Sequence, residues 1–260
     1  MRRLAPAALL LASLAAACGP APRPADAYAS APDLVRDMLA LRARVKSLRA
    51  AGRADHYGER GRVQGKIFAF AKEPGRLRVD LMSPFGSTLA LLTADGAVFR
   101  LSDLRESRYY EGPAEPCNIA RLIGVPLAPE DAIAALAGST PVIEGAPVVE
   151  WDGGGFYRVR IDGNGLAQTL EIGPSRRVLP LKRSLLERGG EVVFDMTFDR
   201  WLDVGGASVP HEIRVRMPRE KAELLVRYDE GAVEVNVDLP DDAFTQTPPA
   251  GATVSKVTCR

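Results

Sequence analysis

Hydrophobic and polar residues alternate with a period of two over most of the chain after residue 53. Clear examples are residues 77–81, 157–161, 192–198, 213–217 and 233–239. Such alternation is typical of antiparallel strands that bury one face and expose the other. Glycine-rich turns separate these segments. The pattern therefore predicts a mainly β fold built around one antiparallel sheet.

A helical spacing of apolar residues precedes the strands. It predicts a helix over residues 33–51, with Asp33 as its cap and Gly52 at its end. The opposite face is basic, and we interpret it as solvated, the alternative being contact with anionic lipid. Its residues are Arg36, Arg42, Arg44, Lys46 and Arg49.

Residues 116–138 interrupt the strand pattern. They predict two short helices, over 118–123 and 129–137, which Gly124-Val125-Pro126 separates. Pro129 followed by acidic residues suits the start of a helix. No internal repeat or domain boundary is evident. We expect a single α+β domain over residues 32–260, with a strongly curved sheet and helices in or over its concave side.

The N-terminus has the layout of a secretory signal over residues 1–17. Arg2 and Arg3 precede an uncharged stretch that ends in three alanines. At roughly 14 residues, this stretch is shorter than the ~20 needed to span a bilayer. Residues 1–17 are therefore predicted to be a signal peptide.

Cys18 follows the three alanines directly, and this arrangement resembles the lipobox of bacterial lipoproteins. Ala15 stands where a leucine is usual. The resemblance implies a lipid anchor on Cys18, and Gly19 after it implies the outer membrane, with the domain facing the periplasm. The alternative is an ordinary cleaved signal. Residues 18–31 are then the lipidated cysteine and a Pro/Ala-rich tether, which we expect to be extended and disordered.

The charge balance bears on nucleic-acid binding, and the cysteine content bears on a disulfide. The 34 basic and 33 acidic residues leave no basic excess for nucleic-acid binding. With Cys18 lipidated, Cys117 and Cys259 remain in an oxidising compartment, where a disulfide is the simplest outcome. The alternative is that Cys259, next to the chain end, is unpaired.

Catalytic and metal-binding patterns are missing from the sequence. The two histidines, His56 and His211, lie far apart, and the glycine run 153–155 lies between strands, as in a hairpin turn. No serine stands in a G-x-S-x-G motif. We expect a binding protein without metal or cofactor rather than an enzyme, with a hydrolase as a further alternative.

Large apolar residues gather on the predicted strands. They form either a plain packed core or the lining of a concave cavity that suits acyl chains. The candidate lining residues are Phe68, Phe70, Leu81, Leu89, Leu91, Phe194, Met196, Phe198 and Trp201.

Two long stretches resemble the outer-membrane lipoprotein-insertion receptor family LolB and its periplasmic carrier relative LolA. They are LRVDLMSPFGSTLALLTADGAVFRLSD (77–103) and RYYEGPAEPCNIARLIGVPLAPEDAIAALAG (108–138). Two later stretches, GASVPHEIRVRM and AVEVNVDLPDDAFTQTPPAG, are similar to late strands of LolA-like envelope lipoproteins. The shared order of short motifs carries the resemblance.

The resemblance implies an incomplete, half-open barrel with a helical lid over an apolar cavity that holds acyl chains. Its implied partners are acyl chains of lipoproteins or phospholipids, outer-membrane lipid and a periplasmic LolA-like carrier. The implied function is transfer or insertion of these molecules at the outer membrane. The chain is longer than a typical receptor, so the alternative is an accessory envelope lipoprotein that uses the fold as an interaction platform.

The loop Pro84-Phe85-Gly86 matches the receptor loop that helps to deliver cargo into the membrane. Pro84 breaks the strand ladder and Gly86 lets the chain turn back. We expect Phe85 to be exposed at the loop tip. The alternative is that it folds back as a plug over the sheet edge.

Overall fold

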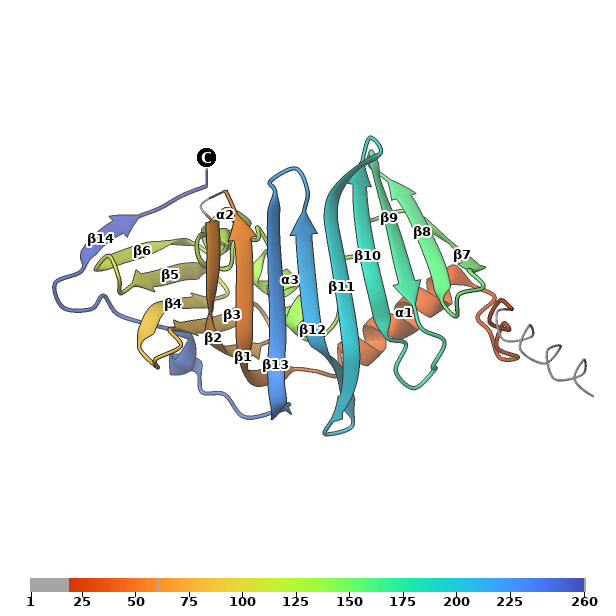
Figure 1. Cartoon of the computed structure of the whole chain (residues 1–260), viewed down its shortest axis with the longest axis horizontal. Coiled ribbons are helices and arrows are strands. Elements are labelled where there is room, and N and C mark those ends of the chain that lie inside the picture. Colours follow the sequence, from red (N-terminus) through yellow and green to blue (C-terminus); the bar gives the residue numbers. More distant parts are fainter. Residues whose placement is uncertain (1–18, 60, 260) are drawn as a thin grey trace, which may run out of the picture.

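The computed structural model describes residues 19–59 and 61–259, so the predicted signal peptide and Cys18 lie outside the described residues. The described residues form one sheet of fourteen strands, which curves strongly and carries helices on its inner face (Figure 1). The strand order is β14-β6-β5-β4-β3-β2-β1-β13-β12-β11-β10-β9-β8-β7. The mainly β, single-sheet prediction is confirmed.

The first seven strands are β1 (Ser47–Gly58), β2 (Gly61–Lys72), β3 (Arg76–Met82), β4 (Thr88–Asp95), β5 (Val98–Asp103), β6 (Arg108–Pro113) and β7 (Ala146–Trp151). The others are β8 (Tyr157–Gly163), β9 (Leu166–Ile172), β10 (Leu181–Arg188), β11 (Glu191–Val204), β12 (Ala207–Met217), β13 (Ala222–Val235) and β14 (Thr253–Lys256). All neighbours pair antiparallel except β14, which lies parallel to β6.

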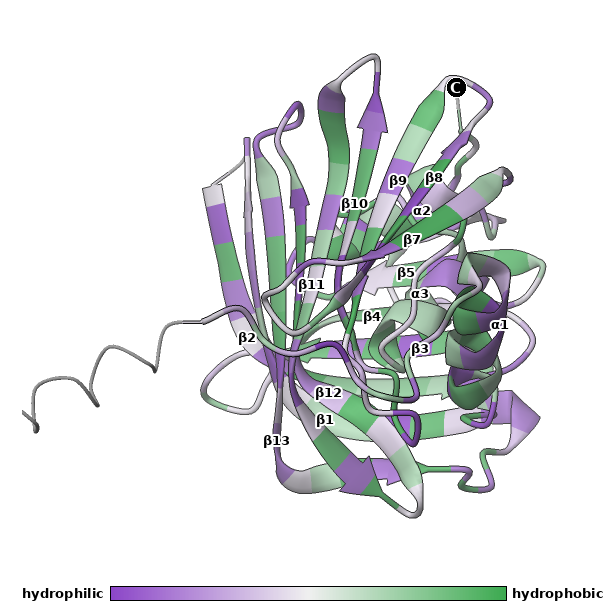
Figure 2. Ribbon diagram, turned by 90° about the vertical axis from the view of Figure 1, so that its right-hand side faces the viewer, coloured by the Kyte–Doolittle hydropathy of each residue, from purple (hydrophilic) through white to green (hydrophobic). Residues whose placement is uncertain are grey.

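Three α-helices cover the inner face of the sheet: α1 (Ala31–Arg42), α2 (Pro116–Ile123) and α3 (Pro129–Leu136). Helix α1 lies against β7 and β12, α2 against β4 and β5, and α3 against β3 and β12. Figure 2 shows α1 and α3 stacked beside the concave side of the sheet. The two short helices each begin at a proline, and Gly124 ends α2 with a φ of 74°.

The predicted helix over residues 33–51 is too long. Helix α1 begins at Ala31, because Ser30 accepts a hydrogen bond from the Asp33 backbone N–H, and ends at Arg42. The remaining residues enter β1, where Leu48 and Ala50 face inward by strand alternation. Pairing with β2 and β13 on both sides outweighs a helical spacing that only a few residues carried.

The basic face predicted for that helix is therefore divided. Arg42 is buried, Lys46 lies in the connection to β1 and pairs with Glu73, and Arg49 pairs with Glu234 across the sheet. These residues do not form one surface that could lie on a lipid bilayer.

The described part of the tether is docked rather than disordered. The Trp151 indole N–H donates to the Ala21 carbonyl at 2.9 Å, and the Ala21 N–H donates to Gly153 at 2.7 Å. Tyr28 is buried, its backbone N–H donates to the Tyr157 hydroxyl, and the aromatic ring of Tyr28 packs edge-on against that of Tyr157. Two aromatic anchors thus override the extended preference of a Pro/Ala-rich segment.

The C-terminal residues form a strap over the outer face of β3–β6, which we define as residues 236–259. Its short 3-10 helix η2 (Asp241–Phe244) contacts β3 and β4, and Phe244 is fully buried there. The Gln246 side-chain amide donates to the Leu91 and Arg100 carbonyls, both at 3.0 Å. The strap then adds β14 to the sheet edge.

Candidate functional site

An apolar cavity of about 100 Å³ lies between the sheet and helices α2 and α3. Every side chain in its lining except that of His56 is alanine, valine, leucine or isoleucine. The strands contribute Ala54, His56, Val63, Ile67, Ala69, Leu77, Val79, Leu81, Ile213, Val215, Leu224 and Val226, and the helices and their joint contribute Leu122, Ile123, Leu127, Ala132, Ala135 and Leu136.

The cavity follows from strand alternation and from small residues. Leu77, Val79 and Leu81 point inward from β3, as the sequence pattern indicates, and Ile213 and Val215 do so from β12. Alanines at 69 on β2 and at 132 and 135 on α3 face the same space. Because methyl groups cannot fill the gap between a helix and a sheet, empty volume remains.

The cavity runs along the strands from an exposed end to a buried one. Val63, near the β1–β2 hairpin, is 39% exposed, whereas Leu77 at the start of β3 is fully buried. Between Val63 and Ala69 the lining of β2 extends over six residues, about 20 Å of strand. The mouth therefore lies at the hairpin end, beside Leu122 and Ile123.

Leu81 alone among the predicted cavity residues belongs to this lining. Phe68 and Phe70 point to the outer face, since Ile67, Ala69 and Ala71 occupy the inward positions of β2. Phe68 is 39% exposed, and Phe70 lies under the Arg78 guanidinium. This corrects their assignment to the cavity, because the phenylalanines of β2 occupy the positions that face outward.

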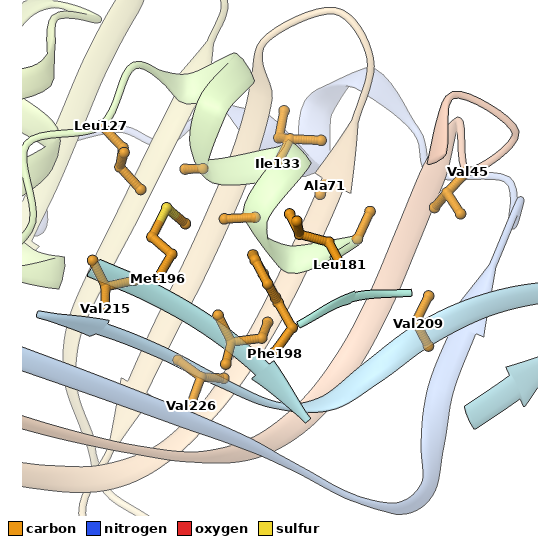
Figure 3. Packing of buried hydrophobic residues seen from close by; sticks show 14 of the residues in the cluster. Val45, Ala71, Leu127, Ile133, Leu181, Met196, Phe198, Val209, Val215 and Val226 are labelled. Carbon is orange, nitrogen blue, oxygen red and sulfur yellow. The ribbon is translucent and has the colours of Figure 1, made fainter. Parts of the chain in front are cut away.

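Met196 and Phe198 are core residues in another part of the inner face. Both are almost fully buried and lie near Leu181 and α3 (Figure 3). Phe194, on the same strand, packs against the core from a half-buried position. The alternative of a plain packed core thus describes them, and they do not line the cavity.

Trp201 lies outside the cavity lining and stacks against the side chain of Arg42. The guanidinium of Arg42 lies 4.6 Å from its ring centroid and donates to the Ser208 and Val178 carbonyls. Burial lowers the pKa of Arg42 to about 10. This stacked arginine joins the end of α1 to β12.

Leu89 and Leu91 alternate in the opposite phase to the inward residues Ala90 and Leu92. Leu91 stands opposite Asp80 and Ser102 in the outer layer, while Leu89 packs against the edge of the core. Residues 89–92 are all apolar, so polarity does not indicate which of them face inward. The assignment of Leu89 and Leu91 to the cavity is therefore corrected.

Phe85 is 96% exposed at the tip of the β3–β4 loop and does not fold back over the sheet edge. The loop is held by the Ser83 N–H, which donates to Ser87, and by the Gly86 N–H, which donates to Ser83. Gly86 has a φ of 86°, a conformation that favours glycine. Antiparallel pairing places this loop at the same strand end as the cavity mouth.

His56 is the functional candidate that the sequence analysis missed as a cavity residue. Its Nε2 is buried and has no hydrogen-bond partner among the described residues. Burial lowers the pKa of the imidazole, and the neighbouring Asp55 carboxylate opposes this only in part. Its position two residues after Ala54, in the inward phase of β1, is the signal that could have revealed it.

Cys117 and Cys259 are joined by a disulfide, with their Cα atoms 5.8 Å apart. The bond connects the end of the strap to the first turn of α2. Among the described residues, the one grouping with metal-ligand geometry is Glu115 with these two cysteines, whose sulfurs are already bonded to each other. In the same part of the chain, no helix has the length and apolarity required to cross a bilayer.

Neither a protein-family model nor a curated protein sequence matches the chain. Solved structures do match. A DUF1329 family protein from Desulfovibrio piger has a TM-score of 0.56 at 13% identity, over 83% of this chain and 97% of that one. A LolA superfamily protein from Nitrosomonas europaea has a TM-score of 0.56 at 12% identity, over 84% and 99%.

A domain assigned to outer-membrane lipoprotein sorting in Vibrio parahaemolyticus is similar as well. Its TM-score is 0.55 at 12% identity, over 82% of this chain and 97% of that one. At such low identities these likenesses concern the fold. The chain therefore has the open, curved-sheet fold seen in the LolA superfamily.

Proposed function

We propose that the protein is an outer-membrane lipoprotein, not an enzyme, that binds acyl chains in its apolar cavity. Its cargo would be lipoproteins or phospholipids, received from a periplasmic LolA-like carrier and passed on to the outer membrane. The observation that carries the proposal is the lining, in which all side chains but one are aliphatic over about 20 Å of strand. A long, narrow, aliphatic space suits a hydrocarbon chain.

The cavity must enlarge to accept such a chain. At about 100 Å³ it is smaller than the ~150 Å³ cavities that hold a single benzene molecule. Its roof consists of two short helices of eight residues each, without a side-chain cap at either start; the Cys117–Cys259 bond holds the first turn of α2, and the Tyr228 hydroxyl donates to Leu136 at the end of α3. We infer that α2 and α3 act as the lid of the cavity and move outward when a ligand enters.

The direct test is whether the protein carries and binds lipid. The mature chain with Cys18 replaced by serine is purified and analysed for bound lipid by mass spectrometry, and a fluorescent fatty acid is then titrated into it. We expect co-purified acyl lipid and saturable binding. A protein that carries no lipid and leaves the fluorescent fatty acid free would refute the proposal.

Phe85 is proposed to enter the membrane surface or the path of the cargo. Since its ring is almost fully exposed, Phe85→Glu removes no core contact, and the free energy of unfolding should change by less than about 0.5 kcal/mol. Vesicle binding or cargo release should be abolished. A large loss of thermal stability in this variant would show that Phe85 is structural. Leu104→Glu, on the neighbouring β5–β6 turn and 42% exposed, is the control for adding a negative charge at this end of the sheet.

Cys18 is proposed as the anchor. Two acyl chains on one cysteine hold a protein stably on a bilayer where one does not. Cys18→Ser should therefore move the protein from the membrane pellet to the supernatant of fractionated cells. If the variant still sediments with outer membranes after a high-salt wash, another feature anchors it.

One observation favours the second function, an interaction platform. Strand β7 ends the sheet with one edge unpaired among the described residues, and its Val148 is 68% exposed. Free strand edges can accept a strand from another protein. Cross-linking in cells, followed by recovery of one envelope complex without acyl ligand, would favour this function over lipid binding.

A further inference from the structure

The cavity lining contains a single side chain that can form a hydrogen bond, His56. Its Nε2 is buried and lacks a partner in the described part of the chain. Leaving a buried polar group unpaired lowers stability, and such groups in native proteins call for an explanation. An apolar residue here would avoid this cost, so the imidazole points to a partner that arrives with a ligand.

The position of His56 specifies which part of a ligand it would meet. It lies near the end of β1, directly opposite Val63 on β2 and Leu224 on β13. Val63 is at the exposed mouth, whereas the far end of the cavity is closed by buried residues such as Leu77. A chain that enters tail first therefore leaves its polar end beside His56.

The imidazole packs against the backbone of Gly124, and its Nε2 forms no hydrogen bond there. A Cβ placed on Gly124 would lie 2.1 Å from Nε2, so the joint between α2 and α3 rests directly on the ring, as only a glycine allows. The same joint would have to move when the lid opens. Opening of the lid would thus uncover Nε2 at the moment when a ligand occupies the mouth.

The chemistry of the ring indicates the kind of group that binds. Burial lowers the pKa of His56 and so favours the neutral imidazole, in which one ring nitrogen is an N–H donor. A neutral donor in apolar surroundings suits the carbonyl oxygen of an acyl group. The nearest carboxylate in sequence, Asp55, is held by Arg62 at 2.8 Å and does not occupy Nε2.

We infer that His56 recognises the polar end of the acyl ligand, with its Nε2–H donating to the acyl carbonyl oxygen at the cavity mouth. This inference rests on the proposed acyl binding and adds a specificity to it. The cavity should prefer a chain with a carbonyl end, as ester or as free acid, over a plain hydrocarbon of the same length.

The test is displacement of diphenylhexatriene, a fluorescent hydrocarbon without a carbonyl group, by dodecanoate, methyl dodecanoate and dodecane. In wild type, methyl dodecanoate and dodecanoate should both bind more tightly than dodecane, and equal affinities for all three would overturn the inference. His56→Leu should weaken the ester and the acid about 3- to 10-fold, as for one hydrogen bond. Binding of dodecane and of diphenylhexatriene should stay unchanged.

Two further variants separate recognition from structure. His56→Gln keeps an N–H donor and should restore part of the preference for the ester. His211→Leu, which changes the chain's other histidine outside the cavity lining, should leave all three affinities unchanged. If His56→Leu binds the ester as wild type does, or loses dodecane equally, the inference is overturned.

A second measurement needs no variant at position 56. The ring nitrogens of the two histidines are observed by ¹⁵N NMR, and His211→Leu assigns them. The Nε2 signal of His56 should shift when methyl dodecanoate is added but not with dodecane, and equal shifts would overturn the inference. If no probe binds wild type, including diphenylhexatriene, the proposed function itself fails and the role of His56 fails with it.

Discussion

Ala135→Leu should abolish acyl binding while the protein keeps or gains stability. Ala135 lies on α3, is buried and faces the cavity. A leucine there places an isobutyl group in the space of about 100 Å³ that a ligand would enter. Cavity filling commonly stabilises a protein by about 0.5–2 kcal/mol. Fatty-acid titration should show a loss of more than about tenfold in affinity, which corresponds to 1.4 kcal/mol.

The neighbouring Ala134 provides the control. It is on the same helix but faces the separate hollow that Arg42 and Glu73 line. Ala134→Leu makes the same chemical change and alters helix propensity equally, so its binding should match wild type. If both variants lose binding, the helix and not the cavity is responsible. If Ala135→Leu binds normally, the ligand lies elsewhere.

Replacement of both Cys117 and Cys259 by serine should cause the largest loss of stability. The disulfide closes a loop of 142 residues, and the chain-entropy model assigns about 5 kcal/mol to such a loop. For a chain of this size each kcal/mol shifts Tm by about 2–4 °C. We therefore expect Tm to fall by about 10–20 °C.

Thermal unfolding with and without reductant measures the effect. Wild type in reductant should approach the double-serine variant, and the variant should not respond to reductant. Because the bond ties the strap to α2, hydrogen exchange should rise first in η2, β14 and α2. A double variant as stable as wild type would show that the contacts of Phe244 and Gln246 hold the strap without the bond.

The sequence predicted the elements that are marked by local signals, such as a proline, a glycine or alternating charged residues. The two short helices were placed within two residues of α2 and α3, because Pro129 starts the second and Gly124 separates them. The inward phase of β3 and β12 was also correct, since charged residues alternate with Leu77, Val79 and Val215. Where local signals and the tertiary arrangement agree, the pattern is sufficient.

The errors arose where tertiary pairing decides. Val45 and Leu48 extend a helical spacing, yet β1 pairs with strands from both ends of the chain. Side-chain size misled at Phe68, because two inward positions of β2 are the small residues Ala69 and Ala71, whereas the phenylalanines face outward. His56 shares the inward phase of β1 with Ala54, but only its neighbours across the sheet show that it belongs to an aliphatic cavity lining.

The docked N-terminal segment has a consequence for orientation. Only Gly19 and Pro20 separate Cys18 from Ala21, which is fixed to the β7–β8 hairpin. Phe85 lies between β3 and β4, about nine strand spacings away across the sheet, or roughly 40–45 Å. It also lies at the opposite end of the strands.

A bilayer that held Cys18 would therefore touch the hairpin end, and the mouth of the cavity would face away from it. In this orientation the cavity mouth would face the periplasm, from which a ligand could enter. Under the proposed function, the domain would have to reorient in order to release a ligand into the same bilayer. Release of the Trp151–Ala21 and Tyr28–Tyr157 contacts would lengthen the tether from two residues to about ten and would let the domain turn its cavity mouth toward the bilayer that holds Cys18.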